Sequence, residues 1–167
     1  GELKKPDRDD RVSDQVLDPL FAALPEPAVA DSSKGYSLLI GGIGGTGVVT
    51  SSAPLGIAAR LDDKLCKLLD DTGLAQKFGA VYSHITVSGS QESLHAPRVG
   101  VANCDLLISA DLVSSADDRS LSRLKPGQSR AGINRHETVT GAFTRDADSQ
   151  VPGADLVANI SSACRDG

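Results

Sequence analysis

The sequence contains no methionine and no tryptophan, and aromatic residues make up only 3% of its 167 residues. Its interior must therefore be built from leucine, valine, isoleucine and alanine, as is typical of parallel sheets covered by helices. Hydrophobic residues make up 40% of the chain, which suffices for the core of one domain but not comfortably for two. The lack of methionine and the start at Gly1 suggest a segment of a longer polypeptide.

Basic runs and long apolar runs are also missing. The net charge is −5 with a pI near 5.1, and no stripe of lysine and arginine is interleaved with aromatics, which argues against nucleic acid or an anionic membrane as a partner. No window approaches the roughly 20 apolar residues of a membrane span, and the amino-terminal part lacks the apolar region of a signal peptide. We therefore expect a cytoplasmic protein that binds neither membrane nor nucleic acid.

Cysteine is present without any pattern. Cys66, Cys104 and Cys164 are far apart, odd in number and include no C-x-x-C. They are predicted to be buried or incidental thiols in a reducing compartment, and no metal site is predicted.

The most informative stretch is residues 38–50, LLIGGIGGTGVVT, in which an apolar run ends in a glycine cluster and leads into a segment that can be helical. Gly42, Gly44 and Gly47 satisfy G-x-G-x-x-G, in which the first glycine permits a turn, the second lets the backbone approach a ligand, and the third lets helix and strand pack closely. The loop is therefore a candidate anion site beside a helix N-terminus. No Gly-Lys-Ser/Thr follows, which disfavours a nucleoside triphosphate P-loop.

The pattern along the chain predicts a charged, proline-rich linker over residues 1–34 and one Rossmann-like α/β domain over 35–167, with three layers and an open, mostly parallel sheet. Pro54 is expected to kink the first helix or delay its start, and Asp111 to cap a later one. The predicted strands are 36–40, 64–69, 81–88, 105–110 and 131–134, and the predicted helices are 47–61, a helix after Asp111 that runs through Leu124, and 155–164.

Two acids end the second predicted strand. Asp70 and Asp71 lie about 20 residues beyond the last motif glycine, where a dinucleotide-binding fold places the acid that contacts a ribose. The alternative, which we favour, is a solvated strand end.

No standard catalytic constellation can be assembled. His84 lies on an alternating strand and is predicted to be a hydrogen-bonded sheet residue rather than a metal ligand, because no second ligand stands at metal spacing. His136 and Glu137 are expected on the same rim as the glycine loop, but adjacent residues of an extended segment point to opposite sides. From its residues alone, the chain is predicted to be a binding or docking module.

Several longer stretches resemble a known family in register and order. They are GIGGTGVVT at 42–50, DTGLAQK at 71–77, GAVYSHI at 79–85, HAPRV at 95–99, ADL at 110–112 and NRHETVTGAFTRD at 134–146. They resemble the gamma-type domain of 2-oxoacid:ferredoxin oxidoreductases, and most of all the fused indolepyruvate ferredoxin oxidoreductases. The similarity spans about residues 36–148.

The resemblance implies one part of a large enzyme. Such enzymes use thiamine diphosphate with Mg to decarboxylate an arylpyruvate, pass electrons through [4Fe-4S] clusters to ferredoxin, and transfer the acyl group to coenzyme A. In that family the thiamine and cluster ligands sit on other domains, so this segment is expected to bind no such cofactor alone, to dock on the thiamine-binding and iron–sulfur domains, and to help handle coenzyme A.

No catalytic residue is therefore assigned. The resemblance implies a set of positions in the family motifs as site or interface candidates: Gly42, Gly44, Gly45, Thr46, Gly47, Thr72, Gly73, Gln76, Lys77, His84, His136 and Glu137. A stand-alone dinucleotide-binding module and a purely structural spacer remain the alternative hypotheses.

Overall fold

A computed structural model describes residues 19, 21–25, 28–72, 79–135 and 153–165 of the chain. The chain divides into two units, residues 1–30 and residues 31–167. In the described part of the first unit, one helical turn is closed by a hydrogen bond from the Ala23 N–H to the Pro19 carbonyl (3.1 Å). All further description concerns the second unit.

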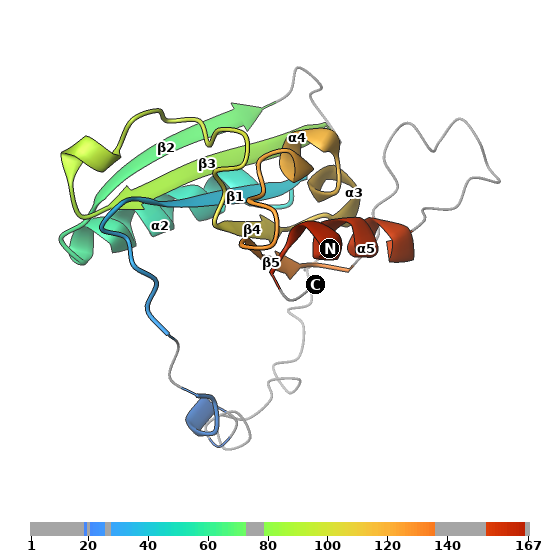
Figure 1. The fold of residues 1–167 in the computed structure, drawn as a ribbon, viewed down its shortest axis with the longest axis horizontal. Coiled ribbons are helices and arrows are strands. Elements are labelled where there is room, and N and C mark those ends of the chain that lie inside the picture. Colours follow the sequence, from blue (N-terminus) through green and yellow to red (C-terminus); the bar gives the residue numbers. More distant parts are fainter. Residues whose placement is uncertain (1–18, 20, 26–27, 73–78, 136–152, 166–167) are drawn as a thin grey trace, which may run out of the picture. The chain divides into compact units, whose positions relative to one another are not determined.

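The second unit is an α/β domain built on a five-stranded sheet with the order β2-β3-β1-β4-β5 (Figure 1). None of the described helices is long and apolar enough to cross a membrane. The elements in chain order are β1 (Tyr36–Ile43), α2 (Val48–Leu61), β2 (Leu65–Thr72), β3 (Ala80–Ser88), β4 (Leu106–Ser109), α3 (Leu112–Ser115), α4 (Asp118–Leu121), β5 (Arg130–Ile133) and α5 (Gly153–Ala163).

The sheet is mixed. β1 pairs in parallel with β4, and β4 with β5, whereas β3 runs antiparallel to both of its neighbours, β1 and β2. Four strands therefore point the same way and one is reversed, which confirms an open α/β sheet, with two parallel and two antiparallel pairings. The reversed strand, β3, lies between β1 and β2 in the sheet. In the chain, β2 follows β1 after α2.

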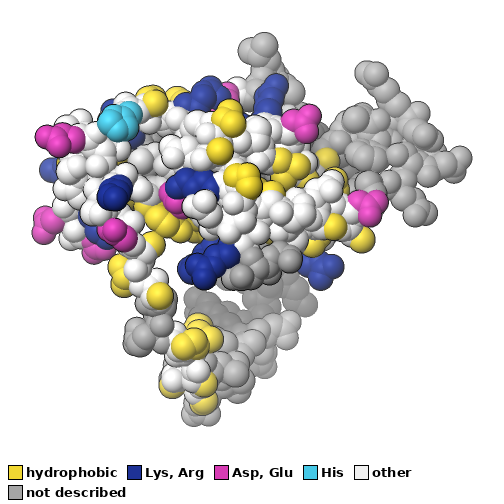
Figure 2. All heavy atoms as spheres, in the orientation of Figure 1, with side chains coloured by type: hydrophobic (Ala, Val, Ile, Leu, Met, Phe, Trp, Pro, Cys, Tyr) yellow, Lys and Arg dark blue, Asp and Glu magenta, His cyan; other side chains and the backbone are white. Residues whose placement is uncertain are grey.

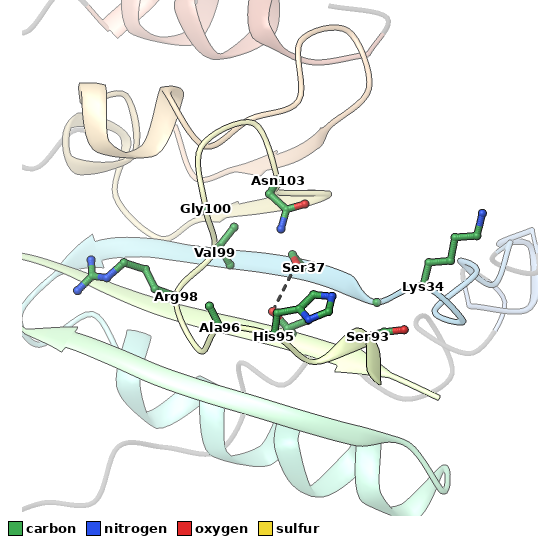
Figure 3. Close-up of a pocket in the computed structure, with 11 residues that line it drawn as sticks. Lys34, Ser37, Ser93, His95, Ala96, Arg98, Val99, Gly100 and Asn103 are labelled. Carbon is green, nitrogen blue, oxygen red and sulfur yellow. Dashed lines mark hydrogen bonds between the residues drawn. The ribbon is translucent and has the colours of Figure 1, made fainter. Parts of the chain in front are cut away.

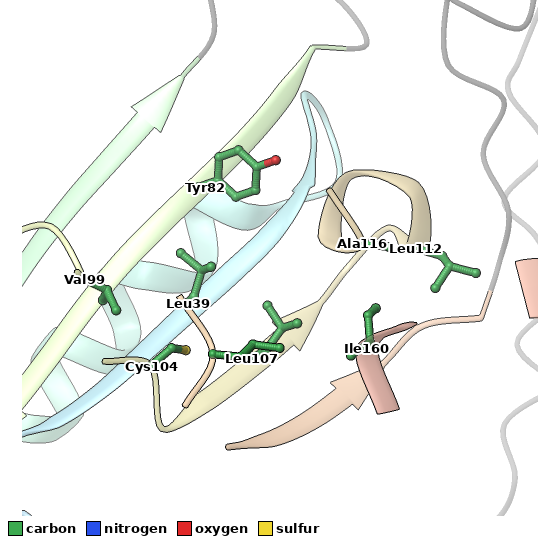
Figure 4. Close-up of a cluster of buried hydrophobic side chains, with 9 residues drawn as sticks. Leu39, Tyr82, Val99, Cys104, Leu107, Leu112, Ala116 and Ile160 are labelled. Atoms are coloured by element: carbon green, nitrogen blue, oxygen red, sulfur yellow. The ribbon is translucent and has the colours of Figure 1, made fainter. Parts of the chain in front are cut away.

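Helices cover both faces of the sheet. Ile40, Val48, Val81 and Ile85 form the core beneath α2. The opposite face carries a larger core, shown in Figure 4 with side chains from α3 and α5 against the strands. Its buried members are Leu39, Tyr82, Val99, Cys104, Leu107, Leu112, Ala116, Leu124 and Ile160.

Helix α2 lies close to the sheet because small residues face inward. Ser52 and Ala59 are buried, and a Cβ placed on Gly56 would lie 2.8 Å from the Leu68 Cδ1. The helix is continuous through Pro54, which is exposed, and it begins at Val48. Pro54 removes one backbone donor, but its ring lies on the exposed side of the helix and does not enter the core. The expected delay of the helix start does not occur.

The bounds of most predicted elements differ by one to three residues, and two of the differences affect the interpretation. The expected helix through Leu124 is wrong: α3 ends at Ser115 and α4 starts after Asp117, whose carboxylate accepts the Ser120 N–H (2.9 Å) as a second N-cap. The second strand runs on to Thr72, because its pairing with β3 continues as far as the Thr72–Val81 pair. Asp70 and Asp71 therefore lie within a strand and not at its end.

Candidate functional site

The glycine loop joins β1 to α2 through a tight turn. The Thr46 N–H and hydroxyl both donate to the Ile43 carbonyl, at 3.1 and 2.7 Å. Gly45 and Gly47 have φ values of +98° and +83°, a conformation that other residues adopt at a cost. These two glycines therefore make the turn.

Gly42 has a different role. It lies within β1, and a Cβ there would stand 2.6 Å from both the Thr46 Oγ1 and the Val48 Cγ2 and 3.1 Å from the Ala110 Cβ. A Cβ on Gly47 would meet nothing within 4 Å. The roles expected from the motif are thus reversed: the first glycine permits close packing, and the third is needed for its backbone conformation.

A cavity of about 320 Å³ lies against this loop. Gly44, Gly45 and Gly47 form one side of it, and Thr72, the last residue of β2, lies on its wall. The structure therefore brings four of the predicted site residues together. Sequence reasoning missed the other described lining residues, which are Ile43, Val48, Val49, Thr50 and Val81; only the alternation of residues 81–88 placed Val81 on an inward face.

None of the described lining residues is charged, so the polarity of this cavity comes from the Thr50 and Thr72 hydroxyls and from backbone groups. The first hydrogen bond of α2 runs from the Ser51 N–H to the Gly47 carbonyl, so the preceding N–H groups lie before the helical ladder. Gly47 is the N-cap and offers no side chain, and the first turn holds no acid. No side chain therefore compensates the positive end of the helix dipole beside the cavity. An anionic group of a ligand could lie at this helix end, and an uncharged group of the same ligand could lie against the uncharged cavity wall.

The two acids of β2 do not face this cavity. The Asp70 Oδ1 accepts hydrogen bonds from the Ser83 Oγ (2.5 Å) and the Ser52 Oγ (3.2 Å), which ties α2 to the sheet. The Asp71 carboxylate pairs with Arg98 at 2.8 Å, and the hydrogen bond from that guanidinium lowers the pKa of Asp71. The favoured interpretation of both as solvated residues is confirmed, because Asp70 is exposed and Asp71 is half-buried, although each carboxylate also has a partner within the domain.

His84 lies away from the glycine loop. Its side chain is 1% exposed, and its Nδ1 accepts the Val99 N–H (3.3 Å) on the sheet face opposite α2. Burial, reinforced by Arg123 and Arg98, lowers the pKa of His84 to about 4. The prediction of a hydrogen-bonded sheet residue is confirmed, and His84 does not join the cavity residues.

The remaining candidates divide between two groups. Thr46 stabilises the turn by its two hydrogen bonds to the Ile43 carbonyl. Gly73, Gln76, Lys77, His136 and Glu137 lie outside the described residues. Within the described part of the chain, no three metal-ligating side chains lie close enough together to hold an ion.

Replacing Gly47 tests the turn directly. We expect Gly47→Ala to lower the free energy of unfolding by about 1 kcal/mol, because the alanine must adopt the left-handed conformation, and Gly47→Asn to lower it by less, since asparagine tolerates that region. Urea unfolding followed by circular dichroism measures both. Equal losses in the two variants would show that space, and not backbone conformation, limits this position.

Together, the sheet and the glycine loop at the carboxyl end of β1 define a Rossmann-like α/β domain with a ligand-sized cavity at its loop edge. A sequence model of the pyruvate ferredoxin/flavodoxin oxidoreductase family matches residues 37–140, which is more than half of the chain. The chain therefore belongs to this family.

Two solved structures are similar in fold. One is a pyruvate oxidoreductase subunit from Thermotoga maritima, with 16% identity and a TM-score of 0.47, covering 68% of this chain and 56% of that one. The other is the gamma subunit of a keto/oxoacid ferredoxin oxidoreductase from Geobacter sulfurreducens, with 19% identity and a TM-score of 0.43, covering 75% of this chain and 70% of that one. The chain thus spans just over half of the Thermotoga subunit. No curated protein sequence matches it.

Proposed function

We propose that this chain is a gamma-type domain of a 2-oxoacid:ferredoxin oxidoreductase, in which it docks on the catalytic domains. The family match over residues 37–140 carries the proposal, because it spans all five strands and the glycine loop. The ordered set of family-like stretches, which most resembles the fused indolepyruvate ferredoxin oxidoreductases, supports an indolepyruvate enzyme, which converts an arylpyruvate to acyl-CoA with reduction of ferredoxin. Thiamine diphosphate, Mg and the [4Fe-4S] clusters then belong to other domains.

The glycine-loop cavity is the part of this domain that we assign to coenzyme A. Its unpaired helix N–H groups suit a phosphate oxygen, and the valine side chains of its wall suit an uncharged arm. A classical dinucleotide site has less support. In that fold the strand after the first helix is the parallel neighbour of β1, whereas here the antiparallel β3 occupies that place.

The outer face of α2 supports docking. Ile57 and Leu61, one turn apart, are 63% and 80% exposed, and Ala53, Pro54 and Ala58 beside them are exposed as well. A surface helix normally carries charged residues on its outer side, but the one basic residue in the last turn of α2 is Arg60. Charges of both signs are interspersed on the face of the molecule shown in Figure 2, where α2 lies behind the sheet. The apolar outer face of α2 is therefore suited to another domain of the enzyme.

Ile57→Glu separates docking from folding. The side chain is largely exposed, so the isolated chain should unfold at the same urea concentration as before, whereas the viologen-reducing activity that co-purifies with the tagged chain should fall about tenfold or more. Val101→Glu is the matched control, because Val101 is 77% exposed in a different part of the domain. Equal activity in the two variants would remove α2 from the interface.

The function itself is tested on the native protein. Anaerobic recovery with an antibody against this segment should yield indolepyruvate-dependent, coenzyme A-dependent reduction of a viologen dye. Absence of that activity, together with tight calorimetric binding of NAD, NADP or FAD by the chain, would instead establish the dinucleotide-binding alternative.

A further inference from the structure

A second cavity, of about 260 Å³, lies on the sheet face opposite α2, between the start of β1 and the segment that follows β3 (Figure 3). Ser37, Thr86 and Val99 form its buried floor, and Lys34, His95, Arg98 and Asn103 stand around its more exposed rim. The glycine motif does not draw attention to this place, although the family-like stretch at 95–99 supplies His95, Arg98 and Val99 to its lining.

The rim is basic. None of the described lining residues is acidic, although the chain as a whole carries a net charge of −5. Within the described part of the chain, the side chains of Lys34 and His95 make no hydrogen bond or ion pair, and Arg98 uses only its Nη1, on Asp71. Lys34 and Arg98 thus stand at opposite ends of the cavity (Figure 3), Arg98 in an ion pair with Asp71 and Lys34 near the Asp31 carboxylate, and the N–H groups that these two side chains leave unused can attract an anion.

The floor holds a buried donor. The Ser37 Oγ and the Thr86 Oγ1 lie 3.3 Å apart and share one hydrogen bond, and neither makes another within the described residues. Each hydroxyl carries one hydrogen, so one of the two hydrogens has no acceptor. Ser37 and Thr86 are 5% and 8% exposed, so that donor is reached chiefly through the cavity that both residues line.

The rim is held in place by contacts outside the cavity. The Lys67 ammonium donates to the Leu94 and His95 carbonyls at 2.8 and 3.0 Å, and the Arg123 Nε donates to the Val99 carbonyl at 3.1 Å. The Val99 N–H is taken by His84. A segment fixed in this way needs little ordering when a ligand enters.

We propose that this cavity binds a phosphate group, with the Ser37–Thr86 hydroxyl pair as the buried donor, Lys34 and Arg98 as the cations of its rim, and the His95 imidazole as a further polar group beside them. The volume accommodates the phosphate group but not an entire nucleotide, so the source is either inorganic phosphate or the phosphate end of a nucleotide whose remainder stays outside. The site is separate from the glycine-loop cavity and does not depend on the function proposed above.

Calorimetric titration of the 167-residue chain with inorganic phosphate, with chloride balancing the ionic strength, tests the proposal. We expect saturable binding that Lys34→Gln weakens about threefold, whereas Arg60→Gln, which removes the same charge from the α2 side, changes it little. The double variant Ser37→Ala/Thr86→Val should weaken binding about tenfold, provided that thermal unfolding shows it folded.

The possible outcomes separate clearly. Tighter binding of ADP than of inorganic phosphate, weakened by Lys34→Gln, identifies the phosphate end of a nucleotide in this cavity, and equal binding of the two identifies free phosphate. The proposal is overturned if phosphate fails to bind at up to about 10 mM, if Lys34→Gln and Arg60→Gln weaken binding equally, or if adenosine binds as well as ADP.

Discussion

Gly42→Ala is expected to lower the free energy of unfolding by about 1–3 kcal/mol, because the added methyl group enters a space that is already filled. It would lie 2.6 Å from the Val48 Cγ2 and from the Thr46 Oγ1. Neither atom can move freely: Val48 is 3% exposed and branched at Cβ, and the Thr46 hydroxyl is bonded to the Ile43 carbonyl. The same shift would displace the start of α2 and reshape the glycine-loop cavity.

Gly132→Ala is the matched control for this substitution. Gly132 also lies in a strand, β5, but a Cβ there would meet nothing within 4 Å and its φ is not positive. The free energy of unfolding of the Gly132→Ala variant should stay within about 0.5 kcal/mol of that of the unsubstituted chain. If urea unfolding gives the same midpoint for both variants, the close contact at Gly42 is relieved by the loop at no cost, and Gly42 has no special packing role.

The unit from β1 through the glycine loop to α2 could be predicted from the sequence because its signals are local. An apolar run, a glycine cluster and a helical segment follow one another, and the structure places β1 at Tyr36–Ile43 and α2 at Val48–Leu61. The alternation over residues 81–88 likewise predicted β3, including the shared face of Tyr82 and His84. Such periodicities report which residues face inward but not which strand lies alongside.

The position of β3 shows what the sequence could not supply. Its place between β1 and β2, antiparallel to both, depends on pairings such as Leu39–His84 and Leu69–His84 between distant segments. For the same reason the acids of β2 could not be placed: Asp70 turns toward Ser83 and α2, and Asp71 toward Arg98 on the other face. The break between α3 and α4 was missed because Asp117 competes as a cap within a sequence that otherwise permits a longer helix.

The two cavities also differ in whether their residues are close together in the sequence. The residues of the glycine-loop cavity are mostly consecutive, so the glycine motif located the cavity although it singled out only the glycines, and Thr72 and Val81 come from elsewhere. The basic cavity draws Lys34, Thr86, His95 and Asn103 from separate stretches with no common spacing. Only the packing of the segment after β3 over the sheet brings them together, and no single-sequence pattern reports that packing.

The stability of the domain is expected to fall steeply in mild acid because of His84. Burial holds its pKa near 4 in the folded chain, well below its ordinary value of 6.5. Between these two values the unfolded chain binds a proton that the folded chain does not, so folding is favoured above the ordinary pKa and this contribution is lost as the pH falls. Full protonation would remove about 3 kcal/mol, taking the difference between the two pKa values at about 1.4 kcal/mol per unit.

His84→Asn isolates this contribution from the other groups that titrate in acid, such as Asp71. The asparagine oxygen can accept the Val99 N–H in place of the Nδ1, but the side chain does not titrate. At pH 7 the variant should be less stable than the original chain, by about 1–2 kcal/mol, because the buried ring is lost. Near pH 4.5 the difference should vanish or reverse, since only the original chain must keep its imidazole neutral. Urea unfolding at both pH values measures the two differences, and an unchanged difference would mean that His84 is solvated or protonated in the folded chain.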